Sequence, residues 1–188
     1  MLALLKRYLA HNATLNADEL AAIISRFKPM KAKRGTLLYR QGETSDKLFF
    51  INKGSLRVYY LSQQGVERTR LFAFEGMLAT SLASFISGQP SFEFVEALED
   101  TELLAVAGHD FFALAETVAG WKDFYCSLLE SAYIHNNHRL ESLVTLNAKE
   151  RYEQVLAQNP QIVQRVPNKI VATYLDISPE TLSRLKSD

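Results

Sequence analysis

The stretch that decides the fold is residues 170–186, which read IVATYLDISPETLSRLK. Its first half predicts a helix with Val171 and Leu175 on its apolar face, and a small alanine between them lets a second helix cross closely. Asp176 stands at a turn, where aspartate tolerates left-handed backbone better than most residues. Ser178 is a good N-cap, and the proline after it suits a first helical turn. The stretch therefore predicts a helix-turn-helix of the kind that enters the major groove of DNA.

The second helix of this stretch has a polar face once its leucines turn back toward the first helix. Side chains on such a face contact the bases and phosphates of DNA. The candidate DNA-contacting residues are Ser178, Glu180, Thr181, Arg184 and Lys186. Two amphipathic helices in an ordinary bundle are the alternative, but the turn, the cap and the polar face together favour DNA recognition.

Residues 34–106 have a different pattern, in which glycine-centred turns separate short runs of β-forming residues. The runs cover residues 36–39, 48–51, 56–60, 67–71, 92–97 and 102–106. Several short strands at this spacing predict a β-sandwich or barrel. Apolar and acidic residues alternate over 92–97, which is typical of a half-buried strand. The small apolar run 77–85 predicts a short buried helix inside the β region.

Helical patterns flank the β region. Residues 1–28 are predicted to be helical, with a capping box at Asn16 and Glu19, and Pro29 is expected to end this segment. After the β region, residues 110–117 predict a short helix.

Residues 120–146 predict a long helix with an apolar stripe at spacings of three and four. The stripe consists of Trp121, Phe124, Leu128, Ala132 and His135. A long helix of this kind is often a dimerisation helix or an interdomain spine, with an ordinary core helix as the alternative. Residues 147–188 then predict a small helical module, beginning with a cap at Asn147.

The composition narrows the class of protein. The chain has 188 residues, 47% of them hydrophobic, with 21 basic and 21 acidic residues and therefore no net charge. Any nucleic-acid contact must come from a local patch. The single cysteine, Cys126, excludes a cysteine-ligated iron–sulfur cluster or Cys₄ zinc site. With no apolar run that could span a membrane and no signal-peptide core after the first residues, a cytoplasmic protein is expected.

With the helix-turn-helix, the Gln41-Gly42-Glu43 turn and the 76–97 segment in this order, the chain resembles the catabolite activator and fumarate/nitrate-type (Crp/Fnr) family of bacterial transcription regulators. It looks most like the short members found in Bacteroidetes-type bacteria. The resemblance implies an α+β fold with a jelly-roll, double-stranded β-helix barrel similar to cyclic-nucleotide-binding domains. It implies a sensor domain over 1–117, a dimerisation helix over 118–146 and a DNA-binding module over 147–188.

The resemblance also implies partners and residue roles. Duplex DNA, a second copy of the chain, a small effector and RNA polymerase are the partners that it suggests. Residues that match Glu180 and Arg184 read bases in the family, whereas Ser178 and Thr181 are expected to hold phosphates. The chain stops at Asp188 with no sequence for the β-hairpin wing of many relatives, which predicts few phosphate contacts per subunit.

The effector remains unidentified, because the usual ligands of cyclic AMP are replaced. A glutamate and an arginine hold the ribose and the cyclic phosphate in cyclic-AMP-binding relatives, and these positions fall on Thr80-Ser81 and Ser91 here. No lysine or arginine occurs between Leu71 and Trp121. The base-contacting positions of the long helix map to Asn136 and Asn137. We therefore expect a sensor domain without tight cyclic AMP binding, and its pocket has no identified cofactor.

Three other interpretations are weaker. His135 and His138 are spaced like two metal ligands, with Glu141 as the nearest carboxylate, but solvated or seam histidines are expected and no metal site is predicted. Cys126 is expected to be a buried thiol rather than a disulfide partner. Cupin-type catalysis needs histidines inside the barrel, and residues 34–106 contain none, so no enzyme is expected. A signalling or protein-interaction module with a vestigial helix-turn-helix stays as the alternative function.

Overall fold

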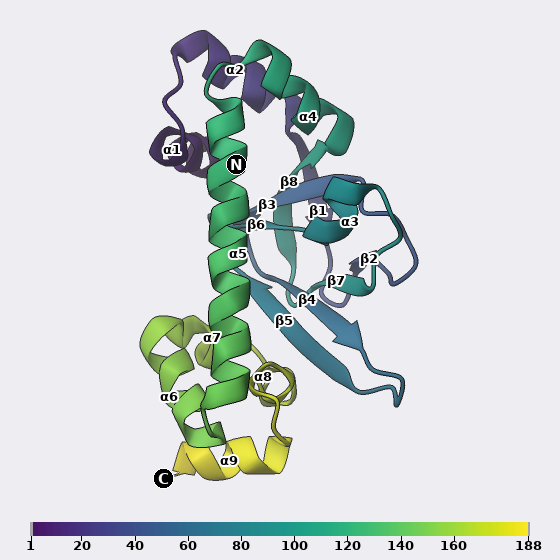
Figure 1. Cartoon of the computed structure of the whole chain (residues 1–188), viewed down its shortest axis with the longest axis vertical. Helices are drawn as coiled ribbons and strands as arrows, with labels where there is room; N and C mark the ends of the chain where they lie inside the picture. The colour runs from purple at the N-terminus through teal and green to yellow at the C-terminus, as the bar shows by residue number, and fades with distance from the viewer. Residues whose placement is uncertain (1, 188) are drawn as a thin grey trace. The chain divides into compact units, whose positions relative to one another are not determined.

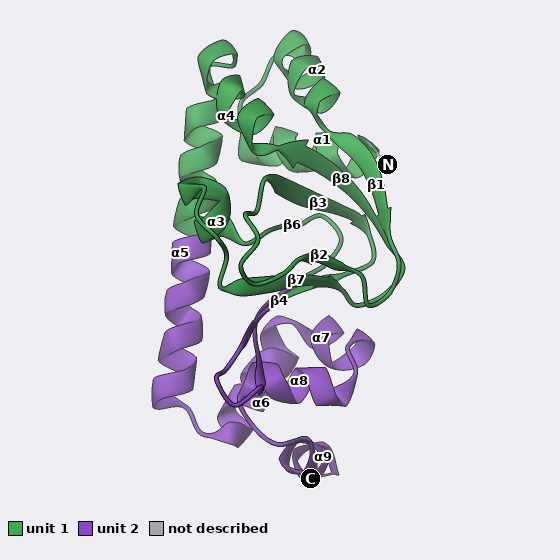
Figure 2. Ribbon diagram, turned by 90° about the vertical axis from the view of Figure 1, so that its right-hand side faces the viewer, with its two compact units in different colours: residues 1–58, 73–131 green, residues 59–72, 132–188 purple. Residues whose placement is uncertain are grey.

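The computed structural model describes residues 2–187. The chain divides into two compact units, one formed by residues 1–58 and 73–131 and the other by residues 59–72 and 132–188 (Figure 2). The border falls inside the β4–β5 hairpin and inside the long helix α5, so both elements contribute residues to both units. This division follows packing alone, and the functional domains 1–117, 118–146 and 147–188 remain predictions.

The elements up to the long helix make an α+β arrangement (Figure 1). The helices are α1 (Leu2–Asn12), α2 (Ala17–Arg26), α3 (Leu82–Ser87), α4 (Gly108–Thr117) and α5 (Trp121–Thr145). The strands are β1 (Lys28–Ala32), β2 (Leu37–Tyr39), β3 (Lys47–Lys53), β4 (Leu56–Leu61), β5 (Glu67–Ala73), β6 (Leu78–Ala79), β7 (Glu93–Ala97) and β8 (Thr101–Ala107).

The strands form two four-stranded sheets, with the orders β1-β8-β3-β6 and β2-β7-β4-β5. Neighbours in each sheet are mostly distant in sequence, so the chain passes repeatedly from one sheet to the other. This confirms the predicted β-sandwich. Among residues 2–187, closure of the two sheets into a barrel is not seen.

Two segments differ from the sequence prediction. The predicted single helical segment is two helices, α1 and α2, in the part of it that the structure describes; α2 ends at Arg26, and Pro29 lies inside β1 opposite Leu104 of β8. Because β1 is the edge strand of its sheet, the missing N–H of proline is tolerated there. The helix predicted over 77–85 begins only at Leu82, since residues 78–79 pair with β3 as the short strand β6.

The capping box predicted at the second helix is confirmed. The Asn16 side chain accepts a hydrogen bond from the Glu19 backbone N–H at 2.9 Å, and a Glu19 carboxylate oxygen accepts from the Asn16 backbone N–H at 2.9 Å. These bonds satisfy backbone donors that the first turn of a helix leaves open.

The hydrophobic core of the first unit lies between its helices and the β3–β8 sheet. Phe50 and Leu104 come from the sheet, and Phe111, Trp121 and Phe124 come from α4 and α5. Trp121 is 1% exposed, and its indole N–H donates to the Phe111 carbonyl at 2.7 Å. The N-terminal part of α5 is therefore a core helix of this unit.

The second unit contains the C-terminal helices together with the tip of the β4–β5 hairpin. The helices are α6 (Ala148–Gln158), α7 (Pro160–Arg165), α8 (Asn168–Leu175) and α9 (Pro179–Ser187). The Asn147 side chain caps α6 through the backbone N–H groups of Lys149 and Glu150. Within the described residues, no helix is long and apolar enough to cross a membrane.

A tight approach at Gly54, between β3 and β4, gives a stability prediction. Its φ is +94°, and a Cβ there would lie 2.6 Å from Thr101 Oγ1 and 2.9 Å from Thr101 Cα. Gly54→Ala is therefore expected to lower the free energy of unfolding by more than the roughly 1–3 kcal/mol that such backbone strain costs alone. Urea unfolding followed by circular dichroism measures the change.

Gly42→Ala is the matched control for this prediction. Gly42 has a similar φ of +88°, but a Cβ there would meet nothing within 4 Å. The Gly42→Ala variant should therefore show the cost of backbone strain without the steric clash. If both variants lost the same free energy of unfolding, the close approach to Thr101 would contribute nothing to the effect of Gly54→Ala.

Candidate functional site

The turn between α8 and α9 has the local geometry that the sequence predicts. Asp176 is left-handed, with φ 55° and ψ 47°, and it is the only non-glycine residue with positive φ in the described chain. Val171, Leu175 and Leu182 are completely buried, so the two helices pack on a shared apolar contact. The buried contact leaves the opposite face of α9 to solvent.

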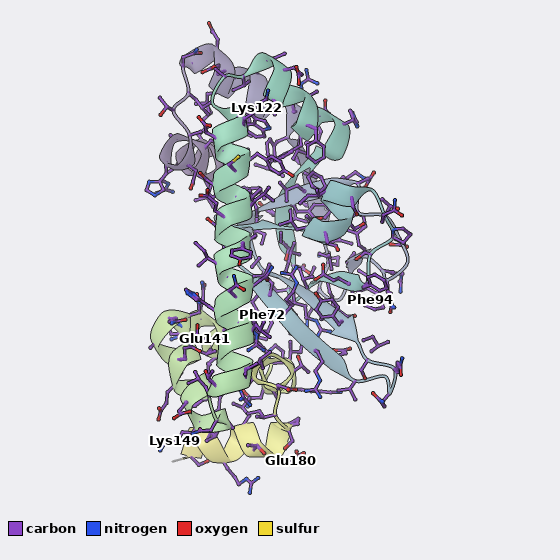
Figure 3. The ribbon with its side chains drawn as sticks, viewed as in Figure 1. Phe72, Phe94, Lys122, Glu141, Lys149 and Glu180 are labelled. Atoms are coloured by element: carbon purple, nitrogen blue, oxygen red, sulfur yellow. The ribbon has the colours of Figure 1, made fainter. Side chains whose placement is uncertain are left out.

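Polar side chains at the start of α9 hold one another in place. The Thr181 backbone N–H donates to Ser178 Oγ at 3.2 Å, which confirms Ser178 as the N-cap. The side-chain oxygens of Ser178 and Thr181 also lie 3.2 Å apart. A hydrogen bond from Ser178 lowers the pKa of the exposed Glu180 carboxyl, which therefore stays ionised at neutral pH. Figure 3 labels Glu180 on α9.

The basic residues of α9 are exposed and make few contacts with the rest of the unit. Arg184 Nη2 lies 3.4 Å from Thr181 Oγ1, a long contact that leaves most of the guanidinium donors available. Lys186 Nζ donates to the Asn168 side chain at 2.6 Å, across to the start of α8. The structure thus brings all five candidate DNA-contacting residues together along one short helix and its cap.

The tip of the β4–β5 hairpin holds α8 from another side. Arg68 forms an ion pair with Asp176 in the turn. The hydroxyl oxygens of Thr69 and Thr173 are 2.6 Å apart, and the Phe72 and Tyr174 rings lie 5.2 Å apart between centroids. The sequence did not indicate these contacts, because they join residues about a hundred positions apart.

The polar residues proposed for the effector pocket do not form an open site. Ser81 Oγ donates to the Glu93 carboxylate at 2.7 Å, and Ser91 Oγ donates to Ser81 Oγ at 2.7 Å. The Glu93 backbone N–H donates back to Ser91 Oγ at 2.8 Å. All three residues are at most 5% exposed. We call this cluster of Ser81, Ser91 and Glu93 the serine–glutamate cluster.

Thr80 lies beside the serine–glutamate cluster but bonds elsewhere. Its hydroxyl donates to the Lys47 carbonyl at 2.7 Å and lies 2.6 Å from Ser45 Oγ. Glu93 is a functional candidate that the sequence analysis missed. The alternation of 92–97 suggested an outward-facing acid, whereas Glu93 faces inward and is 5% exposed.

Asn136 and Asn137, the other pocket candidates, are exposed residues of α5 in the second unit. The Asn136 side-chain oxygen Oδ1 accepts a hydrogen bond from Arg70 Nη1 at 3.3 Å. In the first unit, the buried Arg57 pairs with Glu96 at 2.6 Å, so its charge is already neutralised. The cationic partner that an incoming phosphate would need is thus engaged by a carboxylate.

The predicted dimer stripe is directed mostly toward the chain's own core. Trp121 and Phe124 are at most 2% exposed, and Leu128 packs against the same cluster. Ala132 and His135 are half-buried. Trp121, Phe124 and Leu128 are therefore engaged within the chain, and the sequence could not tell such a core contact from a contact with a second copy.

A different stripe of α5 is exposed and apolar. Tyr133, Leu140 and Val144 are 69%, 61% and 75% exposed. They follow each other by seven and four residues, which places them on one side of the helix. Cys126 is exposed, not buried as predicted. In residues 2–187, no group of three or more histidine, cysteine or acidic residues is placed to hold a metal ion.

The comparisons with known proteins agree with this arrangement. The model of the cyclic nucleotide-binding domain matches residues 29–118. Electron transport regulator A of Shewanella oneidensis is 25% identical, covering 92% of this chain and 73% of its own. The cyclic AMP receptor protein of Thermus thermophilus is also 25% identical, covering 91% and 81% respectively.

Solved structures support the same fold. The crystal structure of a proposed transcriptional regulator of the crp/fnr family from Eubacterium rectale superimposes on this chain with a TM-score of 0.74. The superposition covers 95% of this chain and 85% of the Eubacterium rectale chain, at 19% sequence identity. At this identity the likeness supports the fold and no particular ligand.

Proposed function

We infer that the chain belongs to the Crp/Fnr family of transcription regulators, and we propose from this premise that it binds duplex DNA through a helix-turn-helix formed by α8 and α9. The observation that carries the proposal is the exposed polar face of α9 above a fully buried apolar contact. Glu180 and Arg184 are the base-reading residues, and Ser178, Thr181 and Lys186 hold phosphates. We propose the cytoplasm as the location of the protein. RNA polymerase is the further partner that the family suggests.

Arg184→Ala tests the DNA proposal directly. Loss of a guanidinium that reads a base should weaken binding to a selected operator by roughly 1–3 kcal/mol and relax one base position. Folding should be unaffected, because the Arg184 side chain is exposed and makes only a long contact. Operator selection from a random duplex pool, followed by fluorescence anisotropy, measures both effects.

Lys122→Ala is the matched control, because it removes one exposed positive charge at the N-terminal end of α5, outside the proposed helix-turn-helix (Figure 3). It should leave operator binding unchanged. If Arg184→Ala lost the same binding affinity for operator DNA as for random DNA, Arg184 would be a phosphate contact. If the unmodified protein bound no duplex with salt-dependent affinity, the DNA proposal would fail and a protein-interaction module would replace it.

We propose that two copies associate along the exposed stripe of Tyr133, Leu140 and Val144. A run of large exposed apolar side chains on one helix face is unfavourable in water and marks an interaction surface. Residues seven apart on a helix face are the spacing of a coiled-coil seam. Two copies would then present two recognition helices to half-sites about one helical turn apart.

We propose further that the sensor domain responds to an effector other than cyclic AMP. In the serine–glutamate cluster, the hydroxyls of Ser81 and Ser91 are already engaged with each other and with Glu93, so they are not available to hold a phosphate. The buried Arg57 of the same unit is engaged by the Glu96 carboxylate, so it does not offer an incoming phosphate a bidentate partner. The effector itself is not identified by these residues.

The expected result with cyclic AMP is no saturable change in the thermal unfolding midpoint up to millimolar concentration. A ligand that bound the folded state at one hundred times its dissociation constant would stabilise it by roughly 2.7 kcal/mol. Glu93→Gln is the companion variant, because it removes the charge and keeps the shape. A saturating shift in the unmodified protein would contradict the proposal, and a shift only in Glu93→Gln would identify the carboxylate as the barrier.

A further inference from the structure

A pocket of about 80 Å³ lies wholly within the second unit, among α5, α6, α7 and α8. Its lining includes His135, His138, Arg139, Arg151, Gln154 and Tyr174. The floor is apolar and buried, whereas His138, Gln158 and Asn159 at the rim are exposed. The pocket shares no lining residue with the polar face of α9 or with the serine–glutamate cluster.

The pocket is positively charged without a matching anion. Two guanidinium groups and two imidazoles line it, and none of the described lining residues is an aspartate or glutamate. Arg139 donates to the Tyr174 carbonyl, and its guanidinium carbon lies 4.1 Å from the centre of the Tyr174 ring. Among the described residues, its positive charge is therefore met by a neutral carbonyl and an aromatic face, with no carboxylate.

The guanidinium group of Arg151 is likewise bonded to backbone carbonyls and not to a carboxylate. Its Nε donates to the Leu175 carbonyl at 2.9 Å, and Nη1 donates to the Leu146 carbonyl at 2.6 Å. No ion pair of Arg139 or Arg151 is formed with any described residue. Partly buried guanidinium groups normally pair with an anion, because desolvating an unpaired charge is costly.

Two buried polar atoms of the lining residues also lack partners. Arg139 Nε and His135 Nε2 are fully buried and have no hydrogen-bond partner in the described structure. Burial lowers the pKa of both groups, and the positive charges of Arg70, Arg139 and His138 lower the pKa of His135 further. His135 is therefore neutral at neutral pH, and the arginines supply the positive charge of the pocket.

We propose that this pocket binds a small oxyanion of the phosphate class, held by the guanidinium groups of Arg139 and Arg151. Planar guanidinium groups can bind phosphate oxygens through paired N–H···O hydrogen bonds. The amide groups of Gln154, Gln158 and Asn159 supply neutral donors at the rim. The volume is several times the roughly 10–15 Å³ that one water needs, which leaves room for one compact ion and little more.

A bound oxyanion would tie the end of α5 to α6 and α8. Arg139 belongs to α5 and contacts Tyr174 of α8, whereas Arg151 belongs to α6 and contacts Leu175 of α8. One ion between the two arginines would therefore fix the orientation of α8, on which α9 is packed. Any effect on operator affinity rests on the proposed function, but the binding itself does not.

The test is isothermal titration of the full chain with inorganic phosphate, at constant ionic strength in chloride. The expected result is saturable binding of one ion per chain. Arg139→Gln and Arg151→Gln should each weaken it at least tenfold. Arg34→Gln removes one exposed positive charge far along the chain and should change the affinity less than twofold. Methyl phosphate in a parallel titration distinguishes a free-phosphate site from one that accepts phosphate esters.

The rim variant His138→Ala keeps the test valid if either arginine variant fails to fold, because it alters only an exposed side chain. It should weaken phosphate binding at least twofold with an unchanged circular dichroism spectrum. Arg184→Ala should leave phosphate binding intact, which separates the pocket from the DNA-contacting face. Absence of saturable binding, or equal binding in the Arg139→Gln and Arg34→Gln variants, overturns the proposal. If phosphate binding fails while the operator still binds, only the anion pocket is refuted.

Discussion

Replacement of Trp121 by alanine is expected to lower the free energy of unfolding by roughly 3–5 kcal/mol, as for other large aromatic side chains removed from a core. The indole ring lies 5.0 Å from the Phe111 ring and 4.7 Å from the Phe124 ring between centroids. Truncation removes both contacts and leaves a cavity. It also removes the N–H that bonds the buried Phe111 carbonyl at 2.7 Å, so that acceptor loses its partner.

Leu140→Ala on the same helix is the control, because Leu140 is 61% exposed in the chain. Its effect on the unfolding of dilute, monomeric protein should be within about 0.5 kcal/mol. Trp121 is the single tryptophan, so circular dichroism must follow the transition in place of intrinsic fluorescence. If Trp121→Ala left stability unchanged but weakened self-association, the residue would face a second copy, as its spacing on the helix first suggested.

Local signals in the sequence predicted local structure well. The caps at Asn16 and Asn147 and the left-handed turn at Asp176 each depend on residues within three or four positions. Such contacts form in the same way wherever the helix lies in the fold. The polar face of α9 was predictable for the same reason, since the positions of leucines determine which side of a short helix is buried.

Features that depend on distant partners were not predictable. The two residues of β6 become a strand only because Phe49 and Phe50 of β3 lie beside them. Glu93 shares the buried face of β7 with Val95 and Ala97, and there its carboxylate accepts a hydrogen bond from Ser81, twelve positions earlier. In both cases the local sequence is compatible with another structure, and a tertiary contact decides between them.

The long helix α5 shows the same limit in a different form. Two of its faces carry apolar side chains at helical spacing, one through Trp121 and Phe124 and the other through Tyr133 and Leu140. Periodicity identifies both as surfaces that avoid water. Only the folded chain shows that the first is covered by its own core and the second is exposed.

Leu182→Ala is expected to cost roughly 2–5 kcal/mol of stability in the second unit, in the range of buried leucines elsewhere. Leu182 is completely buried, and it is the residue of α9 through which that helix is anchored in the apolar contact with α8. Without it, α9 retains its polar side chains but loses its fixed position. Urea unfolding and operator binding, measured on the same preparation, give the two effects.

The pattern of the two effects separates positioning from contact. Leu156→Ala, at a leucine of α6 that is 39% exposed, is the control and should cost far less stability than the Leu182 variant. Leu182→Ala should lose both stability and operator affinity, whereas Arg184→Ala should lose affinity and specificity alone. Full operator affinity in a destabilised Leu182→Ala protein would contradict a recognition helix at α9, because base contacts cannot survive the loss of the packing that aims them.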